Sequence, residues 1–144
     1  MYPDDGFREL AHSQCLRLLA TAPVGRVVFT RRALPAVVPV GFGLDTDGAV
    51  VLRTAAASEL ARAVDGAVVA FEADAVDVPG RAGWSVVVTG HAEVVTEGAE
   101  LGRLRRRVPP SWSPCPDEVF VRIASELVTG RELVTGRTMD AMPA

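Results

Sequence analysis

Lysine is absent from this chain, because all fifteen of its basic residues are arginine. This absence excludes a lysine Schiff base and the lysine of a Walker-type phosphate loop. Cysteine is scarce: Cys15 and Cys115 form no Cys-x-x-Cys motif, so neither a zinc knuckle nor a redox pair is predicted. Histidine is limited to His12 and His91, and the HExxH, GxSxG and GxGxxG motifs are all missing. Redox or group-transfer chemistry would therefore need a cofactor.

The chain also lacks a basic surplus and long apolar runs. Its net charge of -3 at pH 7 argues against a nucleic-acid partner, whose binding usually needs a basic face. No run approaches the ~20 apolar residues that span a bilayer, and the N-terminal sequence has acids where a secretory signal has bases. With 144 residues, of which 49% are hydrophobic, we expect a single cytoplasmic domain with no membrane partner.

The hydrophobic pattern that is present predicts mainly β-structure. Helical spacing over residues 6–21 indicates one amphipathic helix that places Cys15 in the core. Valine-rich runs bounded by Gly, Pro, Asp and Thr follow, at 24–30, 34–45, 49–54, 67–74, 84–96 and 118–130. The Asp47–Gly48 pair predicts a hairpin between the second and third runs. Short helices are expected over 58–65 and 97–106, so the pattern indicates a closed or nearly closed antiparallel barrel.

Several local features have more than one interpretation. Gly90 inside a long strand predicts a bulge or a barrel corner. The proline-rich stretch 108–116 is either a lid or partner-contacting segment, or an ordered connection with Trp112 packed in it. Glu72, Asp74 and Asp77 are expected at the end of a strand as a solvated rim.

The end of the chain and the apolar runs allow two more expectations. The hexapeptide ELVTGR occurs twice, at 126–131 and 132–137; we expect the first copy to end a strand and the second to begin a tail. The runs PAVVPV and VVV are apolar on both faces, which predicts a surface that pairs with a second subunit.

The stretch VVLRTAAASELARAV, residues 50–64, predicts a strand, a turn of small residues and a helix headed by Ser58. The first amides of a helix lack partners within the helix and carry the positive end of its dipole, so such a turn suits a phosphate. Ser58 is also expected to cap the helix. Glu59, however, puts a negative charge where the phosphate would bind.

The ordered set LRLLATAPVGRVVFT, LPAVVPVGFGLD, VVLRTAAASELARA, AVVAFEAD, GWSVVVTGHAEVV and FVRIASELVTGREL resembles the small actinobacterial members of the pyridoxamine 5'-phosphate oxidase-like family. The similarity covers about residues 8–134, the core of a single domain 1–144 with residues 135–144 as a tail. The resemblance implies a six-stranded antiparallel split β-barrel of the FMN-binding type with short flanking helices. It also implies a homodimer with cofactor sites at the subunit interface.

The cofactor implied by the resemblance is FMN, or in some branches a deazaflavin coenzyme or haem. Carried over by position, the ring-binding residues are Val38, Pro39, Val40 and Gly41, the phosphate and ribityl residues are Arg53, Thr54 and Ser58 with Glu59 beside them, and Trp84 and Ser85 contact the ring system. Packing of Trp84 in the core or at the dimer interface is the alternative. For a deazaflavin, RLRRR at 103–107 is either a groove for its polyanionic tail or a solvated helix end.

Two positions depart from the family pattern. Many members have a basic residue in place of Glu59, and often Asn or Lys in place of Gly41. A carboxylate about 6 Å from a phosphate dianion costs roughly 1 to 4 kcal/mol at a partly exposed site. We therefore expect weaker FMN binding than in basic-turn relatives, unless Glu59 points outward and pairs with Arg62 or Arg106.

The sequence is consistent with two functions. The first is a flavin-dependent oxidoreductase that transfers a hydride to or from an unknown small molecule; no catalytic residue is assigned, and His91, Arg81 and Trp112 are the nearest candidates for touching the substrate. The second is a dimeric module without catalysis that binds a flavin, a deazaflavin or haem, or that has lost its cofactor.

Overall fold

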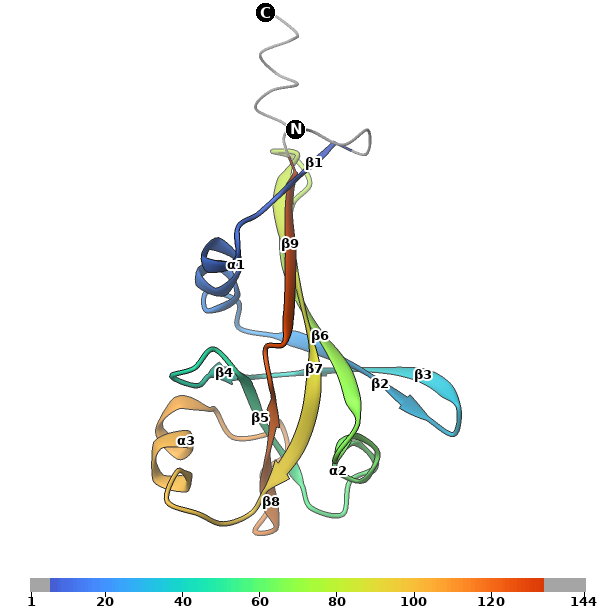
Figure 1. Ribbon diagram of the computed structural model, residues 1–144, viewed down its shortest axis with the longest axis vertical. Coiled ribbons are helices and arrows are strands. Elements are labelled where there is room, and N and C mark those ends of the chain that lie inside the picture. Colours follow the sequence, from blue (N-terminus) through green and yellow to red (C-terminus); the bar gives the residue numbers. More distant parts are fainter. Residues whose placement is uncertain (1–5, 134–144) are drawn as a thin grey trace, which may run out of the picture.

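The computed structural model describes residues 6–133 of the chain (Figure 1). Its elements are, in order, β1 Phe7–Glu9, α1 His12–Leu19, β2 Gly25–Arg31, β3 Leu34–Val40, β4 Gly43–Leu44, β5 Val50–Ala55, α2 Glu59–Val64, β6 Val68–Asp77, β7 Ala82–Val95, α3 Leu101–Arg107, β8 Glu118–Ile123 and β9 Leu127–Leu133. The predicted mainly-β fold with short flanking helices is confirmed. None of the helices in this range is long and apolar enough to cross a membrane.

The strands form one antiparallel sheet in the order β3-β2-β6-β7-β8-β5-β4, with β9 paired to β7 and β1 paired to β9. The two ends of this order, β3 and β4, are joined only by residues 41–42. Since β4 is two residues long, most of β3 and β5 have a free edge within the described range. These two strands diverge from the β4 corner in Figure 1, which leaves the barrel open between them, as expected of a split β-barrel.

Strand β7 connects the two halves of the sheet. It pairs with β6 over residues 82–91, with β9 over residues 83–89 and with β8 over residues 92–95. The exchange of β9 for β8 occurs at Gly90, where an ideal Cβ would lie 1.8 Å from the carbonyl oxygen of Ala124. Gly90 therefore allows the backbone of the β8–β9 turn to approach β7, which is the role expected at a barrel corner.

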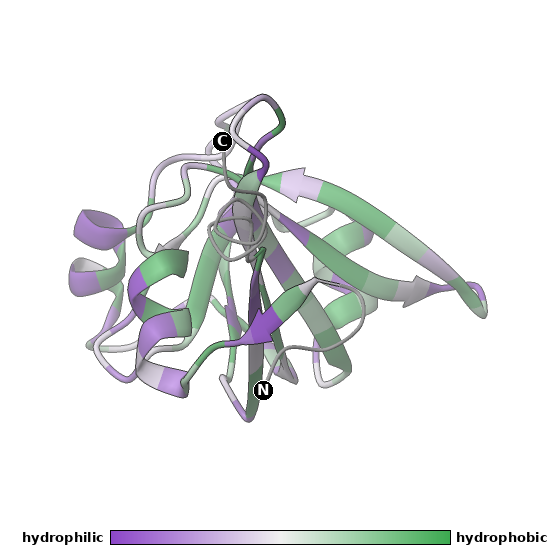
Figure 2. Cartoon of the chain, turned by 90° about the horizontal axis from the view of Figure 1, so that it is seen from above, coloured by the Kyte–Doolittle hydropathy of each residue, from purple (hydrophilic) through white to green (hydrophobic). Residues whose placement is uncertain are grey.

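The core lies on the inner face of the sheet and is covered by α1 and α2. Its fully buried side chains include Leu19, Leu52, Phe71 and Val88, and Cys15 lies among them as predicted. A smaller cluster under α3 consists of Val51, Val95, Leu104, Val108 and Phe120. Figure 2 shows that apolar residues continue along the projecting hairpin of β2 and β3 up to its hydrophilic tip, so this hairpin offers apolar surface outside the core.

Three predicted elements need correction. The first helix begins at His12 rather than at residue 6, because Phe7–Glu9 is extended and pairs with β9. The run 118–130 is two strands, β8 and β9, since the chain turns at residues 124–126. The helix expected over 97–106 is α3, Leu101–Arg107, because the chain first turns at Gly98, whose φ is +125°.

Strand β6 is longer than predicted, while the Asp47–Gly48 hairpin and the first ELVTGR copy lie close to where they were expected. The acids Glu72, Asp74 and Asp77 were expected on a strand end and a loop, but β6 continues through Asp77, so all three belong to the strand. The Asp47–Gly48 hairpin forms as predicted, with the short strand β4 as the partner of β5. The first ELVTGR copy lies mostly in β9, while the tail 135–144 lies outside the described residues.

Candidate functional site

The two segments expected to hold a cofactor lie on the two sides of the split. The ring-binding segment, residues 38–41, ends β3, and the turn expected to hold the phosphate follows β5. Pro35 and Pro39 are both on β3, an edge strand, where the missing N–H of proline costs no ladder hydrogen bond if it points outward. Their spacing predicts that residues 35, 37 and 39 turn their peptide groups to the open edge. Backbone acceptors, and the N–H of Val37, are thereby offered to a ligand in the split.

The side chains of this segment alternate between the two faces of the sheet. Val38 packs against the core and Val40 is buried in it, whereas Pro39 is exposed on the outer face. Gly41 follows the strand, and an ideal Cβ there would meet Cγ of Pro109 at 3.4 Å and Nε1 of Trp112 at 4.0 Å. The proline-rich loop 108–117 thus lies beside the end of β3.

The turn after β5 has the hydrogen bonds of a helix start. The Ser58 hydroxyl accepts from the Ala61 N–H at 3.0 Å, so its predicted role as N-cap of α2 is confirmed. Ser58 and Thr54 also share one hydrogen bond of 3.0 Å between their hydroxyls. Thr54 Oγ1 is the donor of this bond, so the proton of the Ser58 hydroxyl is the one that remains available to an anionic ligand.

Glu59 forms an ion pair with Arg31, which ends β2. The expected partners were Arg62 and Arg106, so that part of the prediction is wrong; the β2–β3 hairpin brings Arg31 to the start of α2 instead. Both side chains are about half exposed, at 52% for Arg31 and 49% for Glu59. A cation therefore accompanies the carboxylate at this turn, which reduces the repulsion that Glu59 exerts on a phosphate.

Arg53 is turned away from this turn and toward α3. Its Nη2 donates to the carbonyl oxygens of Arg105 at 2.8 Å and Val108 at 2.7 Å. Its guanidinium lies 5.1 Å from the centre of the Phe120 ring and 4.0 Å from a carboxylate oxygen of Glu118. Nε is buried without a partner among the described residues. Of the predicted phosphate residues, the structure brings together Thr54, Ser58 and Glu59, but not Arg53.

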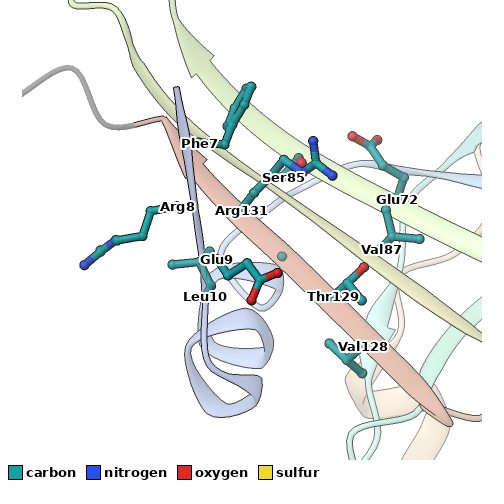
Figure 3. Close-up of a pocket in the computed structure, with 11 residues that line it drawn as sticks. Phe7, Arg8, Glu9, Leu10, Glu72, Ser85, Val87, Val128, Thr129 and Arg131 are labelled. Atoms are coloured by element: carbon teal, nitrogen blue, oxygen red, sulfur yellow. The ribbon is translucent and has the colours of Figure 1, made fainter. Parts of the chain in front are cut away.

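The two residues carried over from β7 lie on opposite faces of the sheet. Trp84 packs against the core, in line with the alternative interpretation of this residue. Ser85 lies on the outer face and lines a groove of about 810 Å³ between β1, β9 and the middle of the sheet (Figure 3). Its other walls are formed by Phe7, Arg8, Glu9, Leu10, Glu72, Val87, Val128, Thr129, Gly130 and Arg131. No sequence signal predicted this groove, because β6, β7, β9 and β1 have to pair before it exists.

Charged side chains cross this outer face between apolar ones. Arg26 on β2 bonds Glu72 at 3.1 Å and Asp74 at 3.5 Å, both on β6. Burial and the neighbouring Asp74 raise the pKa of Glu72 to about 7, although Arg26 opposes the shift. Arg131 lies over the ring of Phe7, 5.5 Å from its centre. The groove thus contains a carboxyl group that titrates near neutral pH.

A second charged cluster lies beneath α3. The Asp45 carboxylate, only 2% exposed, bonds Nε of Arg103 at 2.9 Å and lies 3.6 Å from Nε of Arg122. The hydrogen bond from Arg103 is the main reason why the pKa of Asp45 falls to about 2. Arg103 and Arg107 of the RLRRR segment both contact the β4–β5 hairpin, Arg107 through the Leu44 carbonyl. These two arginines hold the helix in place.

The three candidates for substrate contact lie in different places. His91, at the β7 corner, bonds Glu126 with its Nδ1 at 2.8 Å, and Arg81 lies in the β6–β7 turn with a φ of 53°. Trp112 is 68% exposed and lies next to Gly41. Trp112 is therefore the candidate that the structure places beside the predicted ring-binding segment. Within residues 6–133 no three metal-ligating side chains come together.

Comparison with known proteins agrees with this architecture. The pyridoxamine 5'-phosphate oxidase family matches residues 11–132 of the chain. The chain belongs to this family. A family relationship is also seen with Rv0080 of Mycobacterium tuberculosis, an uncharacterized protein that is 44% identical over 131 residues, which are 88% of this chain and 85% of Rv0080.

Two solved structures are similar to this member of the pyridoxamine 5'-phosphate oxidase family over most of its length. The FAD binding protein of Mycobacterium smegmatis has a TM-score of 0.78 at 32% identity, and the match covers 88% of this chain and 98% of that protein. The conserved protein DIP1874 of Corynebacterium diphtheriae, of unknown function, has a TM-score of 0.75 at 33% identity, over 90% and 100% of the two chains.

Proposed function

We propose that this chain is a flavin-binding protein whose site holds the FMN unit, as FMN itself or as the FMN half of FAD, across the split between β3 and β5. The observation that carries the proposal is that the open edge of β3 faces, across the split, a turn after β5 with hydrogen-bond donors that suit an anion. The flavin named for the M. smegmatis relative supports the same assignment. Because FMN and FAD share the ring, the ribityl chain and the first phosphate, one set of residues serves both.

The donor set at the turn suits a phosphate. The hydroxyl proton of Ser58 and the first amides of α2 supply neutral donors, and Arg31 supplies the nearby positive charge. On the other side of the split, the peptide groups at the edge of β3 match the polar rim of an isoalloxazine ring. Arg53 contributes indirectly: it bonds the Val108 carbonyl and so holds the start of the loop whose Pro109 lies beside Gly41.

As an enzyme, the protein would be an oxidoreductase that acts on a small molecule. A bound flavin supplies hydride transfer at its central ring. The chain's own part is to bind the phosphate, orient the ring along β3 and keep water from one ring face. A dimeric module that binds the flavin without turnover is the alternative, and the pairing of Arg53, His91 and Glu59 with other side chains or carbonyls of the chain favours it.

We further propose a homodimer that uses the outer face of the sheet. Exposed valines and a leucine lie on this face, namely Val37, Val68, Val76 and Leu127, with exposed fractions between 57% and 64%. Their strands are neighbours; Val37, Val68 and Leu127 lie on one side of the Arg26–Glu72 pair and Val76 lies on the other. Apolar areas of this kind usually bind another protein surface. The two unpaired cysteines support the cytoplasm as the compartment.

The test is a visible absorption spectrum of the purified protein, followed by heat release of any chromophore and titration of the colourless fraction with FMN and with FAD. A flavin spectrum, or saturable binding of either flavin, supports the proposal; chromatography of the released flavin distinguishes FMN from FAD. A colourless protein that ignores both contradicts it. Haem and a deazaflavin coenzyme are then titrated in the same way, and no binding at all would indicate a member that has lost its cofactor.

The turn itself is tested with a matched pair of threonine variants. Thr54→Val keeps the shape of the side chain but removes the donor that orients the Ser58 hydroxyl, and it should weaken FMN binding about five- to tenfold. Thr96→Val alters an exposed threonine beyond β7 and should leave the affinity unchanged. Light scattering at the same protein concentrations tests the dimer. Turnover of a reduced nicotinamide with the bound flavin separates the enzyme from the non-catalytic module.

A further inference from the structure

The proline-rich loop between α3 and β8 is held firmly although it has no regular structure. The amide and hydroxyl of Ser111 both donate to Glu118, the amide at 3.1 Å. Glu118 in turn faces Arg53, which also bonds the Val108 carbonyl at the start of the loop. Arg53 and Glu118 are only 16% and 14% exposed, so this network is shielded from water.

Trp112 lies on this fixed loop but is not packed into the protein. It is 68% exposed, whereas the other tryptophan, Trp84, packs against the core. A large aromatic side chain exposed on an anchored loop gains nothing from burial in the folded chain itself. Its indole nitrogen nevertheless lies near the end of β3, 4.0 Å from the position of a Cβ at Gly41.

Gly41 directly follows β3 and lies beside this indole. The nearest atoms to an ideal Cβ at Gly41 are at 3.4 and 4.0 Å, so the glycine is not required by a clash with its neighbours. Its φ is also not in the positive range. Because Gly41 has no side chain, its backbone remains uncovered on the side of Pro109 and Trp112.

We infer that Trp112 is a wall of the ligand site, which packs its indole against the ring of a bound flavin at the Gly41 end of β3. This inference rests on the proposed flavin binding. Aromatic contacts of this kind favour stacked or edge-to-face pairs and add to the affinity. Arg53, Glu118 and Ser111 are then positioning residues, because they fix the loop that presents the indole.

The experiment measures binding of FMN and the emission of the bound FMN in four forms of the full chain: wild type, Trp112→Ala, Trp112→Phe and Trp84→Phe. An indole in contact with a flavin quenches its fluorescence by electron donation. Trp112→Ala should weaken FMN binding about three- to tenfold, since an aromatic pair contributes about 0.5–1.5 kcal/mol. Trp112→Phe should keep most of the affinity but make bound FMN several times brighter. Trp84→Phe should change neither quantity.

Each contrary outcome has a separate meaning. If Trp84→Phe rather than Trp112→Phe restores the emission, or if both Trp112 variants match the wild type, the inference is wrong while flavin binding stands. If the wild type binds neither FMN nor FAD, the proposed function and the inference fail together. Val78→Ala serves as the control for loss of an exposed apolar side chain, because Val78 is 75% exposed in the β6–β7 turn, and its FMN affinity should equal that of the wild type.

Discussion

Arg53 on β5 and Arg31 at the end of β2 both lie near the proposed flavin site, yet their surroundings differ. Arg53 is 16% exposed and bonds two carbonyl oxygens, while Arg31 is 52% exposed and has the single carboxylate of Glu59 as its partner. A buried guanidinium has to be satisfied by the fold, because its desolvation is costly. An exposed guanidinium loses little free energy when it exchanges one ion-pair partner for another, so it remains available to a ligand. Burial therefore distinguishes the charged side chains that stabilise the fold around this site from those that can bind a ligand there.

The strongest test of this comparison is Arg53→Met. The variant leaves the Arg105 and Val108 carbonyls and the Glu118 carboxylate without their donor, and we expect it to lower the free energy of unfolding by about 2–4 kcal/mol. Arg31→Met is the control and should change it by about 0.5 kcal/mol or less. Urea unfolding of both variants measures the difference. Equal losses would mean that burial does not distinguish the two arginines.

Asp45 extends the comparison to a buried carboxylate. Its pKa of about 2 is below the unfolded value, so it stabilises the fold above about pH 4, and this contribution is lost as the pH falls toward 2. Asp45→Asn should cost about 2 kcal/mol at pH 7 and progressively less below pH 4. Asp47→Asn, at a 57% exposed partner of Arg122, should have little effect at either pH. Urea midpoints across this range would contradict the prediction if the two variants behaved alike.

Glu72 is intermediate, since it is 26% exposed and shares Arg26 with Asp74. Its folded pKa of about 7 lies above the unfolded value of about 4.3, so its contribution is fully favourable below pH 4.3 and is lost as the pH rises through 7. Glu72→Gln should therefore stabilise the protein by about 1–2 kcal/mol at pH 8 and not at pH 4. Thermal unfolding at one protein concentration measures this. A variant less stable than wild type at pH 8 would show that the ionised carboxylate is favourable.

The smallest expected effect concerns the exposed pair at α2. Glu59→Gln should raise FMN affinity about three- to tenfold at low salt, because it removes a negative charge near the phosphate, and the gain should shrink at high salt. Arg31→Gln should lower the affinity by a similar factor. Glu97→Gln, an exposed acid beyond β7, is the control and should change nothing. Fluorescence titrations at two salt concentrations decide, and an unchanged or lower affinity of Glu59→Gln would refute the explanation.

Local sequence signals predicted the features that depend on a few neighbouring residues. The Ser58 cap, the Asp47–Gly48 turn and the burial of Cys15 all follow from side-chain chemistry or spacing within one element. The approximate ranges of most strands follow from valine-rich runs between turn residues. The ends of elements were less well predicted where distant pairing decides them. Phe7 continues the helical spacing of the next residues, but Leu133 pairs with it and makes it part of a strand.

The charged contacts of the site could not be predicted, because they join residues that only the fold brings together. Arg31 and Glu59 are 28 positions apart, and Arg53 bonds a carbonyl 55 positions further on. Sequence spacing favours near partners such as Arg62 for Glu59, while hairpin geometry selects Arg31. The opposite directions of Arg53 and Thr54 could have been inferred from strand alternation, which places successive side chains on opposite faces.

Gly43 limits the variation that this architecture can accept. An ideal Cβ at Gly43 would lie 2.2 Å from the carbonyl oxygen of Arg107, the last residue of α3. Any side chain there displaces the helix end, and with it the carbonyls that receive Arg53 and the loop that carries Trp112. In a saturation-mutagenesis library selected for ligand binding, position 43 should accept glycine alone. The loop positions 113–116 should tolerate wide variation. Intolerance at position 43 would therefore reflect its close contact with the Arg107 backbone and not a contact with the ligand.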